Sequence, residues 1–134
     1  MQIQPYLSFD GRCEEAIEYY RGALGAQVET LMRWKECPMP NEGARPPDDK
    51  VMHARLRIGD AIVMASDGRS TGHPKFEGIT LSLNVANDDE AKRKFPALAE
   101  GGQVQQPLTQ TFFSSSFGML TDRFGVPWMV VVMQ

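Results

Sequence analysis

The stretches Gly25-Ala26-Gln27-Val28 and Gly101-Gly102-Gln103-Val104 are two copies of one short pattern, 76 residues apart. In each copy, a strand-like run and an amphipathic helix pattern precede the glycine, and a strand pattern follows it. The same offset carries Leu7 onto Leu83, so strand, helix and turn match in order. We therefore predict one structural unit used twice, with a ligand pocket between the two copies.

The first copy, expected over residues 1–67, contains one helix and four strands. Negative charge suits the start of a helix, and the helix pattern that begins at Glu14 carries an apolar stripe that stops at Gly25. The dipeptide Gly59-Asp60 predicts a hairpin turn. The stretch 36–50 holds four prolines, which favours a long loop that is either a binding loop or disordered. The expected strands are 3–9, 28–35, 51–58 and 61–65.

The second copy, expected over residues 78–134, follows a linker at 68–77 that is rich in glycine. Asn87 with Glu90 three residues later resembles a capping box, so we expect a helix from 88 to about 100. Pro96 should kink this helix, because proline removes a backbone hydrogen bond. The expected strands begin at 79 and continue with 103–106, 112–120 and 128–133.

Both copies thus have the order strand, helix and three strands, which is written βαβββ. Consecutive strands with short turns pair antiparallel, so parallel βαβ units are not expected. The predicted fold class is α+β, with two βαβββ modules whose sheets are antiparallel or mixed.

Composition excludes several classes of function. The chain has 134 residues, 42% of them hydrophobic, which is ordinary for a globular protein. A net charge of −3 gives no reason to expect nucleic-acid binding, which needs clustered basic residues. No apolar run is long enough to span a membrane, and the start of the chain lacks a signal-peptide pattern, so we expect no membrane attachment and a cytoplasmic location. Cys13 and Cys37 are too few for a zinc ribbon or a disulfide framework.

Three stretches carry a resemblance to a known family: Pro5-Tyr6-Leu7-Ser8-Phe9-Asp10-Gly11, Cys13-Glu14-Glu15-Ala16-Ile17-Glu18-Tyr19-Tyr20 and Thr121-Asp122-Arg123-Phe124-Gly125-Val126-Pro127-Trp128. The chain resembles the PhnB-like branch of the vicinal oxygen chelate superfamily, which includes glyoxalase I, extradiol dioxygenases and fosfomycin and bleomycin resistance proteins. The resemblance implies a single domain over 1–134, with sheets curled around a cleft and commonly completed in a homodimer. A methyltransferase label used in this branch lacks support, because the sequence shows no glycine-rich turn for a methyl donor.

The resemblance also implies four metal-ligand positions. In this chain they fall on Gln4, on Val63 or Met64, on Thr80 and on Met129, none of which is His, Asp or Glu. An amide oxygen and a thioether are poor ligands for the ions that this chemistry uses. We therefore expect no metal and no other cofactor.

His53 is the candidate catalytic residue, because it shares the polar face of its strand with Arg55 and Arg57. A neutral imidazole acts as a base or a hydrogen-bond donor. The expected hairpin places Asp67 next to His53, which suggests a His53–Asp67 pair. The alternative is that this face is solvated or lies at a dimer surface. His73 is expected to be an exposed linker histidine.

A small organic ligand needs a mostly apolar cleft with a few polar groups. The aromatic, hydroxyl-rich stretch 112–117 suits the rim of such a cleft, although its aromatic residues would equally fill a core or an interface. The predicted ligand-binding residues are Gln4, Tyr6, Arg55, Met64, Thr80, Asn84, Phe112 and Met129.

These residues leave three functions open. The first is a metal-independent protein that binds, and in one version transforms, a small polar metabolite. The second is a protein that sequesters a cationic drug, as bleomycin resistance proteins do, although Arg55 and Arg57 on the cleft face oppose it. The third is a metal-dependent lyase or dioxygenase with relocated ligands such as His53, Asp67 and Glu77.

Overall fold

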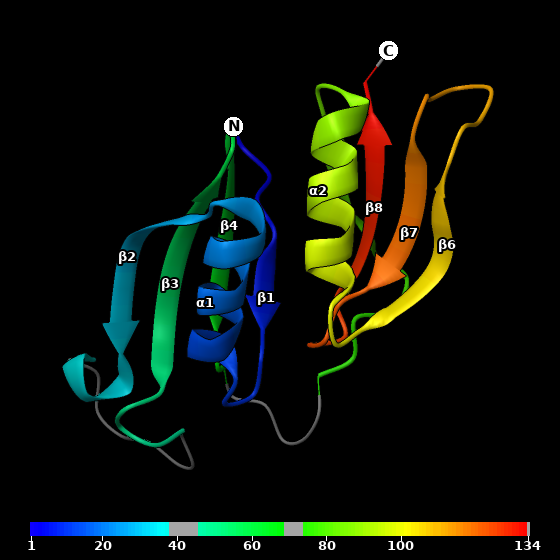
Figure 1. Cartoon of the computed structure of the whole chain (residues 1–134). Coiled ribbons are helices and arrows are strands. Elements are labelled where there is room, and N and C mark those ends of the chain that lie inside the picture. Colours follow the sequence, from blue (N-terminus) through cyan, green and yellow to red (C-terminus); the bar gives the residue numbers. More distant parts are fainter. Residues whose placement is uncertain (38–45, 69–73, 134) are drawn as a thin grey trace. The chain divides into compact units, whose positions relative to one another are not determined.

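The computed structural model describes residues 1–37, 46–68 and 74–133 of the chain. It consists of two compact units, Met1–Pro74 and Lys75–Gln134, and the boundary between them lies inside the expected linker. In each unit one helix packs on one face of a four-stranded sheet (Figure 1). Each unit is described by itself below.

Unit 1, the N-terminal unit, has the strand order β1-β4-β3-β2. Strand β1 pairs parallel with β4, whereas β4, β3 and β2 pair antiparallel. The sheet is therefore mixed, because helix α1 carries the chain from β1 to the far edge at β2. The elements are β1 (Tyr6–Ser8), α1 (Cys13–Leu24), β2 (Gln27–Arg33), the 3₁₀ turn η1 (Trp34–Glu36), β3 (Val51–Ile58) and β4 (Ala61–Ser66).

Unit 2 repeats this arrangement with the strand order β5-β8-β7-β6. Strand β5 pairs parallel with β8, and β8, β7 and β6 pair antiparallel. The twofold βαβββ order and the α+β class are confirmed. The elements are β5 (Leu81–Val85), α2 (Asp88–Ala99), β6 (Gln103–Thr109), β7 (Phe117–Thr121) and β8 (Pro127–Val132).

The helix ends follow the sequence signals. Helix α1 stops at Gly25, which adopts the left-handed conformation with φ of 69° that a residue without Cβ reaches at little cost. At the start of α2, the side chain of Asn87 accepts a hydrogen bond from the Glu90 amide, as expected. The Glu90 carboxylate reaches back to the Ala86 amide, one residue before the usual capping-box partner. Helix α2 continues through Pro96 to Ala99.

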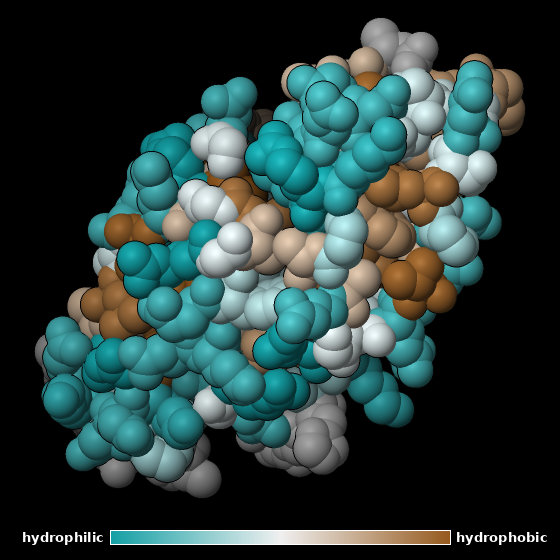
Figure 2. All heavy atoms as spheres, in the orientation of Figure 1, coloured by the Kyte–Doolittle hydropathy of each residue, from teal (hydrophilic) through white to brown (hydrophobic). Residues whose placement is uncertain are grey.

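The core of each unit lies between its helix and one face of its sheet. In β8, Trp128, Val130 and Val132 are buried and alternate with half-buried residues such as Met129, as a strand covered on one side requires. The exposed side of α2 is hydrophilic (Figure 2). The opposite face of each sheet, called the open face below, is not covered by its own helix.

Several strand boundaries differ from the prediction; β5, for example, begins at Leu81 rather than at residue 79, and β6 ends at Thr109 rather than at residue 106. The first strand begins at Tyr6 rather than at residue 3, and Ile3, expected on its apolar face, is 96% exposed. Strand β2 ends at Arg33, where the 3₁₀ turn begins. Strand β7 begins at Phe117, because Thr111 and Ser114 bond to each other in a turn that precludes strand pairing there.

Two sequence features fall outside the described residues, namely His73 and the part of the 36–50 stretch at 38–45. Among the helices that the structure describes, none combines the length and the apolar character needed to cross a membrane.

Candidate functional site

The open face of unit 1 gathers several of the predicted site residues. Met64 of β4 lies between two of them, opposite Tyr6 of β1 on one side and Arg55 of β3 on the other. Side chains two residues apart in a strand share a face, so His53 stands beside Arg55, with about 7 Å between their Cα atoms. This register follows from the Gly59-Asp60 turn, which pairs Ile58 with Ala61. The expected hairpin register is therefore correct from Ala54 opposite Ala65 to the turn.

Tyr6 and His53 are in direct contact. The phenol oxygen lies 2.8 Å from His53 Nδ1, and the ring centroids are 5.5 Å apart. Partial burial raises the pKa of Tyr6 above its usual value; an interaction with the Ser66 hydroxyl opposes this shift, and the nearby Cys13 adds to it. The phenol therefore stays protonated at neutral pH. The pair presents one ionisable imidazole, held by a neutral hydroxyl, on the open face.

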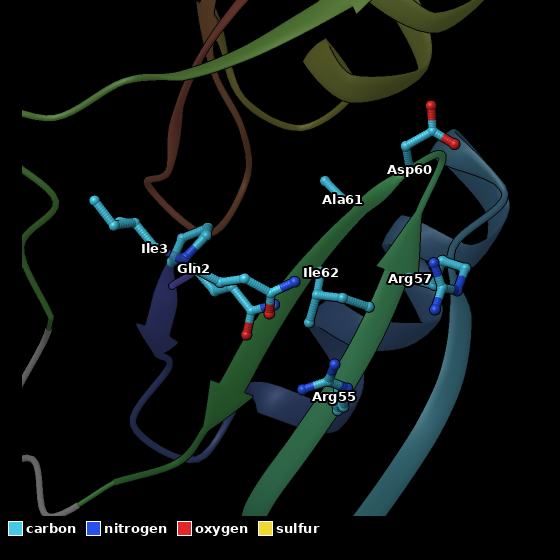
Figure 3. A pocket seen from close by; sticks show the side chains of 9 residues that line it. Gln2, Ile3, Arg55, Arg57, Asp60, Ala61 and Ile62 are labelled. Carbon is cyan, nitrogen blue, oxygen red and sulfur yellow. The ribbon is translucent and has the colours of Figure 1, made fainter.

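A pocket of about 400 Å³ opens beside this pair, between the N-terminal segment and the β3–β4 hairpin (Figure 3). Its volume falls within the range of about 300–1,000 Å³ that is typical of small-molecule sites. Figure 3 shows the Gln2 side chain reaching over β4 towards Ile62, while Arg55 lies on the neighbouring strand. The lining is polar at Gln2, Gln4, Arg55, Arg57 and Asp60, and apolar at Ile3, Pro5, Ala61 and Ile62.

One carboxylate holds the two arginines of the pocket. Arg55 donates from Nε to Glu29 at 3.1 Å, and Arg57 donates from Nε to the other Glu29 oxygen at 2.8 Å. These hydrogen bonds, the one from Arg57 foremost, lower the pKa of Glu29, so its carboxylate stays charged at neutral pH. Glu29 stands at an irregularity in the pairing of β2 with β3, which turns its side chain onto the open face.

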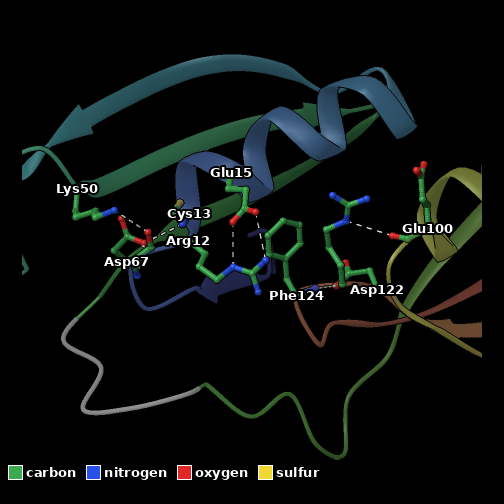
Figure 4. A network of polar contacts seen from close by, with 10 residues as sticks. Arg12, Cys13, Glu15, Lys50, Asp67, Glu100, Asp122 and Phe124 are labelled. Carbon is green, nitrogen blue, oxygen red and sulfur yellow. Dashed lines mark hydrogen bonds and ion pairs between the residues drawn. The ribbon is translucent and has the colours of Figure 1, made fainter.

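The expected pairing of Asp67 with His53 is wrong. Asp67 is only 1% exposed, and its carboxylate accepts hydrogen bonds from the backbone amides of Gly11, Cys13 and Val51 at 2.7–2.9 Å. Figure 4 shows it beside Cys13 at the start of α1. Burial, helped by the charge on Asp67, raises the pKa of Cys13, which makes this thiol unreactive. Asp67 therefore joins the loop before α1 to the start of β3, and His53 has Tyr6 as its partner instead.

The remaining predicted site residues belong to unit 2. Asn84 and Met129 lie on the open face of its sheet, and Asn84 accepts a hydrogen bond from the Ser82 hydroxyl at 2.7 Å. Thr80 precedes β5 and is exposed. Phe112 is 99% exposed in the turn before β7, with its ring edge-on to that of Phe113. Of the predicted residues, Gln4 and Arg55 line the pocket, whereas Tyr6, His53 and Met64 lie on the open face of unit 1 outside its lining. In unit 2, Asn84 and Met129 share the open face of their sheet.

Residues 1–131 match the family model described as 3-demethylubiquinone-9 3-methyltransferase, which is the PhnB-like family. The chain belongs to this family. It is 37% identical to protein YjdN of Escherichia coli over 142 residues, covering 100% of this chain and 97% of YjdN. It is also 47% identical to protein PA1353 of Pseudomonas aeruginosa, with a TM-score of 0.87 and coverage of 100% and 98% of the two chains.

Two further solved structures share the fold of this PhnB-like chain. A PhnB protein from Bacillus cereus is 24% identical over 98% of this chain and 99% of its own, with a TM-score of 0.82. A glyoxylase/bleomycin resistance protein/dioxygenase domain from Frankia is 13% identical over 100% of this chain and 93% of its own, with a TM-score of 0.67. The expected glyoxalase/bleomycin resistance fold is therefore confirmed.

The structure decides which residue of β4 stands at one of the four positions that the family resemblance implies for metal ligands. Val63 is buried on the helix side, so Met64 is the open-face residue of β4 at that position. These positions carry Gln4 and Met64 in unit 1 and Thr80 and Met129 in unit 2, and amide, hydroxyl and thioether groups are each weak donors to hard or borderline divalent ions. Within the described ranges, no three His, Cys, Asp or Glu side chains group closely enough to hold a metal ion.

Four polar residues in the pocket or beside it were missed as candidates in the sequence. Arg57 shares the face of Arg55 and was noted only as its neighbour. Asp60 was assigned to the hairpin turn alone. Gln2 and Glu29 had no distinguishing signal, because Gln2 precedes the strand and Glu29 reaches the open face only through the irregular pairing of β2.

Proposed function

We propose that this PhnB-like protein binds a small polar metabolite in the pocket of unit 1 without a metal ion, and that His53 exchanges a proton with the bound ligand. The observation that carries the proposal is the convergence of Gln4 and Arg55 on one pocket, beside the contact between His53 and Tyr6. Polar groups that converge in a concave site are the usual mark of a ligand site.

The proposal that no metal is used rests on the weak donor groups of Gln4, Met64, Thr80 and Met129, the four positions that the family resemblance implies for metal ligands. The relocated set of His53, Asp67 and Glu77 supports a metal no better, because all the hydrogen bonds of the Asp67 carboxylate go to backbone amides. Withdrawing that carboxylate to bind an ion would leave three amides without partners, at a cost of about 1–3 kcal/mol each.

Sequestration of a cationic drug is less favoured. The pocket lining contributes two guanidinium groups, from Arg55 and Arg57, against the single carboxylate of Asp60. A cation would meet the guanidinium groups directly at the pocket wall, because the Glu29 carboxylate that pairs with them lies outside the lining. Methyl transfer, the activity in the family's description, would also require a site for a methyl donor, for which the sequence holds no glycine-rich turn. A homodimer and a cytoplasmic location remain predictions.

The test begins with protein purified without a histidine tag, so that metal content reflects the chain itself. Chelator-treated protein is then screened by thermal shift against a library of small acids, alcohols and amides at millimolar concentration. We expect less than stoichiometric metal and at least one compound that raises the melting temperature of the parent but not of Arg55→Gln. Arg21→Gln, on the exposed side of α1, is the matched control.

Stoichiometric zinc, nickel, manganese or iron that disappears in His53→Ala would contradict the proposal. So would a library in which every stabilising compound acts equally on the parent and on Arg55→Gln.

A further inference from the structure

Arg55 keeps most of its hydrogen-bonding capacity for the pocket. A guanidinium group has five N–H donors, and Arg55 uses the one on Nε for Glu29. It makes no other hydrogen bond to the described residues, so both terminal amino groups remain available. The side chain is 38% exposed and lines the pocket. Two parallel N–H groups on adjacent terminal nitrogens match the two oxygens of a carboxylate.

Glu29 fixes this geometry without occupying the pocket. It binds Arg57 through Nε and Nη2, both at 2.8 Å, and Arg55 through Nε, and it is not among the lining residues. One carboxylate therefore orients two guanidinium groups, and it engages neither terminal nitrogen of Arg55. A pre-oriented arginine loses less conformational entropy when it binds a ligand.

The rest of the lining limits the ligand further. Gln4 donates its amide N–H to Gln2, which leaves the Gln4 carbonyl and the Gln2 amino group for a ligand. Ile62 and Ile3 contribute apolar atoms to the lining. Figure 3 shows Ile62 on β4, within the hairpin, and the Ile3 side chain pointing away from it. The volume of about 400 Å³ admits a short molecule with one charged end.

We propose that the ligand carries an oxyanion, of the carboxylate type, that the terminal amino groups of Arg55 bind in a bidentate manner. The inference rests on the proposed function and names the chemical class of its ligand. In this arrangement the short body of the acid lies against Ile62, and a hydroxyl or amide on it meets Gln2 and Gln4. A neutral isostere of the acid leaves the terminal amino groups of Arg55 without a charged partner, while Nε still donates to Glu29.

The experiment compares 2-hydroxybutyrate with 2-hydroxybutyramide, which differ in charge but hardly in size. Binding of each probe to the whole chain is measured by NMR titration at low salt. We expect the acid to bind the parent at least about tenfold more tightly than the amide, the usual advantage of a charge-assisted bond. Arg55→Gln should remove this difference, whereas Arg55→Lys should keep part of it.

Asp60→Asn removes a negative charge at the pocket rim, whereas Arg55→Gln removes a positive one. Removing this exposed carboxylate should tighten binding of the acid by about twofold at low salt and leave the amide unchanged. Arg21→Gln should have no effect on either probe.

Equal affinity for the acid and the amide, or an acid affinity that Arg55→Gln leaves intact, would overturn the oxyanion assignment while the metal-independent pocket still stood. No saturable binding of the acid to the parent would also overturn it. The proposed function fails separately, if no compound of the neutral and charged library stabilises the chelator-treated protein.

Discussion

The Tyr6 phenol and the His53 imidazole meet at 2.8 Å across the full width of an intervening strand. Tyr6 lies on β1 and His53 on β3, and β4 separates the two strands in the sheet. The contact therefore depends on three strands holding their register, which the Gly59-Asp60 turn and the parallel pairing of β1 with β4 provide. It gives His53 a fixed ring orientation on the open face.

The first prediction concerns this contact. Tyr6→Phe and His53→Ala should each lower the free energy of unfolding by about 1 kcal/mol or less, because both side chains are partly exposed. The double variant should be less destabilised than the sum of the two, by about 0.5–1 kcal/mol of coupling. Urea denaturation of the parent, the two single variants and the double variant measures this coupling energy. Strict additivity would show that the two side chains do not interact.

Asp67 should matter for stability rather than for chemistry. Asp67→Ala would leave the buried amides of Gly11, Cys13 and Val51 without their acceptor, so we expect a loss of about 3 kcal/mol or more in the free energy of unfolding. Asp60→Asn, at the exposed hairpin turn, is the matched control and should change stability by less than about 0.5 kcal/mol. Chemical denaturation distinguishes the two, and a similar small effect at both positions would contradict the structural role.

Gly102, which follows Gly101 in the second copy of the repeated pattern, should not tolerate a side chain. A Cβ at Gly102 would lie 2.1 Å from the Thr121 carbonyl oxygen and 2.8 Å from the Asp122 carbonyl carbon, both of which are backbone atoms that cannot move aside. We expect Gly102→Ala to destabilise the protein by about 1–3 kcal/mol or more. Gly22→Ala, inside α1 where the added Cβ meets open space, should instead stabilise it by about 0.5–1 kcal/mol. Melting curves of both variants provide the comparison, and effects of the same sign would refute it.

The ion pair between Glu14 and Arg33 predicts a pH dependence. Arg33 donates to both Glu14 oxygens, at 3.0 and 2.6 Å, and this hydrogen bonding lowers the pKa of Glu14. A lowered pKa in the folded state adds stability above the ordinary glutamate pKa of about 4.3, and that stability is lost as the pH falls through the folded value. Because Glu14 is 56% exposed, its contribution should be only about 0.2–1 kcal/mol.

The measurement for this pair is urea denaturation of the parent and Glu14→Gln between about pH 3 and pH 7. The difference in stability should be present at neutral pH and vanish at the acid end. Glu18→Gln on the same helix controls for the loss of a carboxylate. A difference that grows as the pH falls would show that the sign is wrong.

The sequence correctly predicted the strand bounds that depend only on residues close together in the chain. The bounds of β3 agree with the prediction because alternating side chains and the Gly59-Asp60 turn act within a few residues. The start of β1 was wrong because alternation alone does not show where pairing begins, and Met64 first pairs with Tyr6. The two residues that lead up to Tyr6, Gln4 and Pro5, instead line the pocket.

The role of Asp67 could not be read from the sequence for a different reason. Its amide partners Gly11 and Cys13 lie 56 and 54 residues away in the chain, so no short motif connects them. The predicted hairpin register holds from Ile58–Ala61 to Ala54–Ala65, but beyond it the Asp67 amide bonds to the Val51 carbonyl, and the Asp67 side chain turns into the interior. The pairing of Glu29 with Arg55 and Arg57 was missed likewise, because an irregular strand pair shifts the alternation on which the prediction rested.

The central claim is that the pocket of unit 1 binds a small polar ligand without a metal ion. Its most direct test is the amide NMR spectrum of the chelator-treated protein during titration with a compound that raises its melting temperature in the thermal-shift screen. We predict saturable shifts centred on Gln4, Arg55 and Ile62 that are the same after a divalent metal is added back. Shifts that appear only when the metal is present, or that leave these three residues unmoved, would contradict the account.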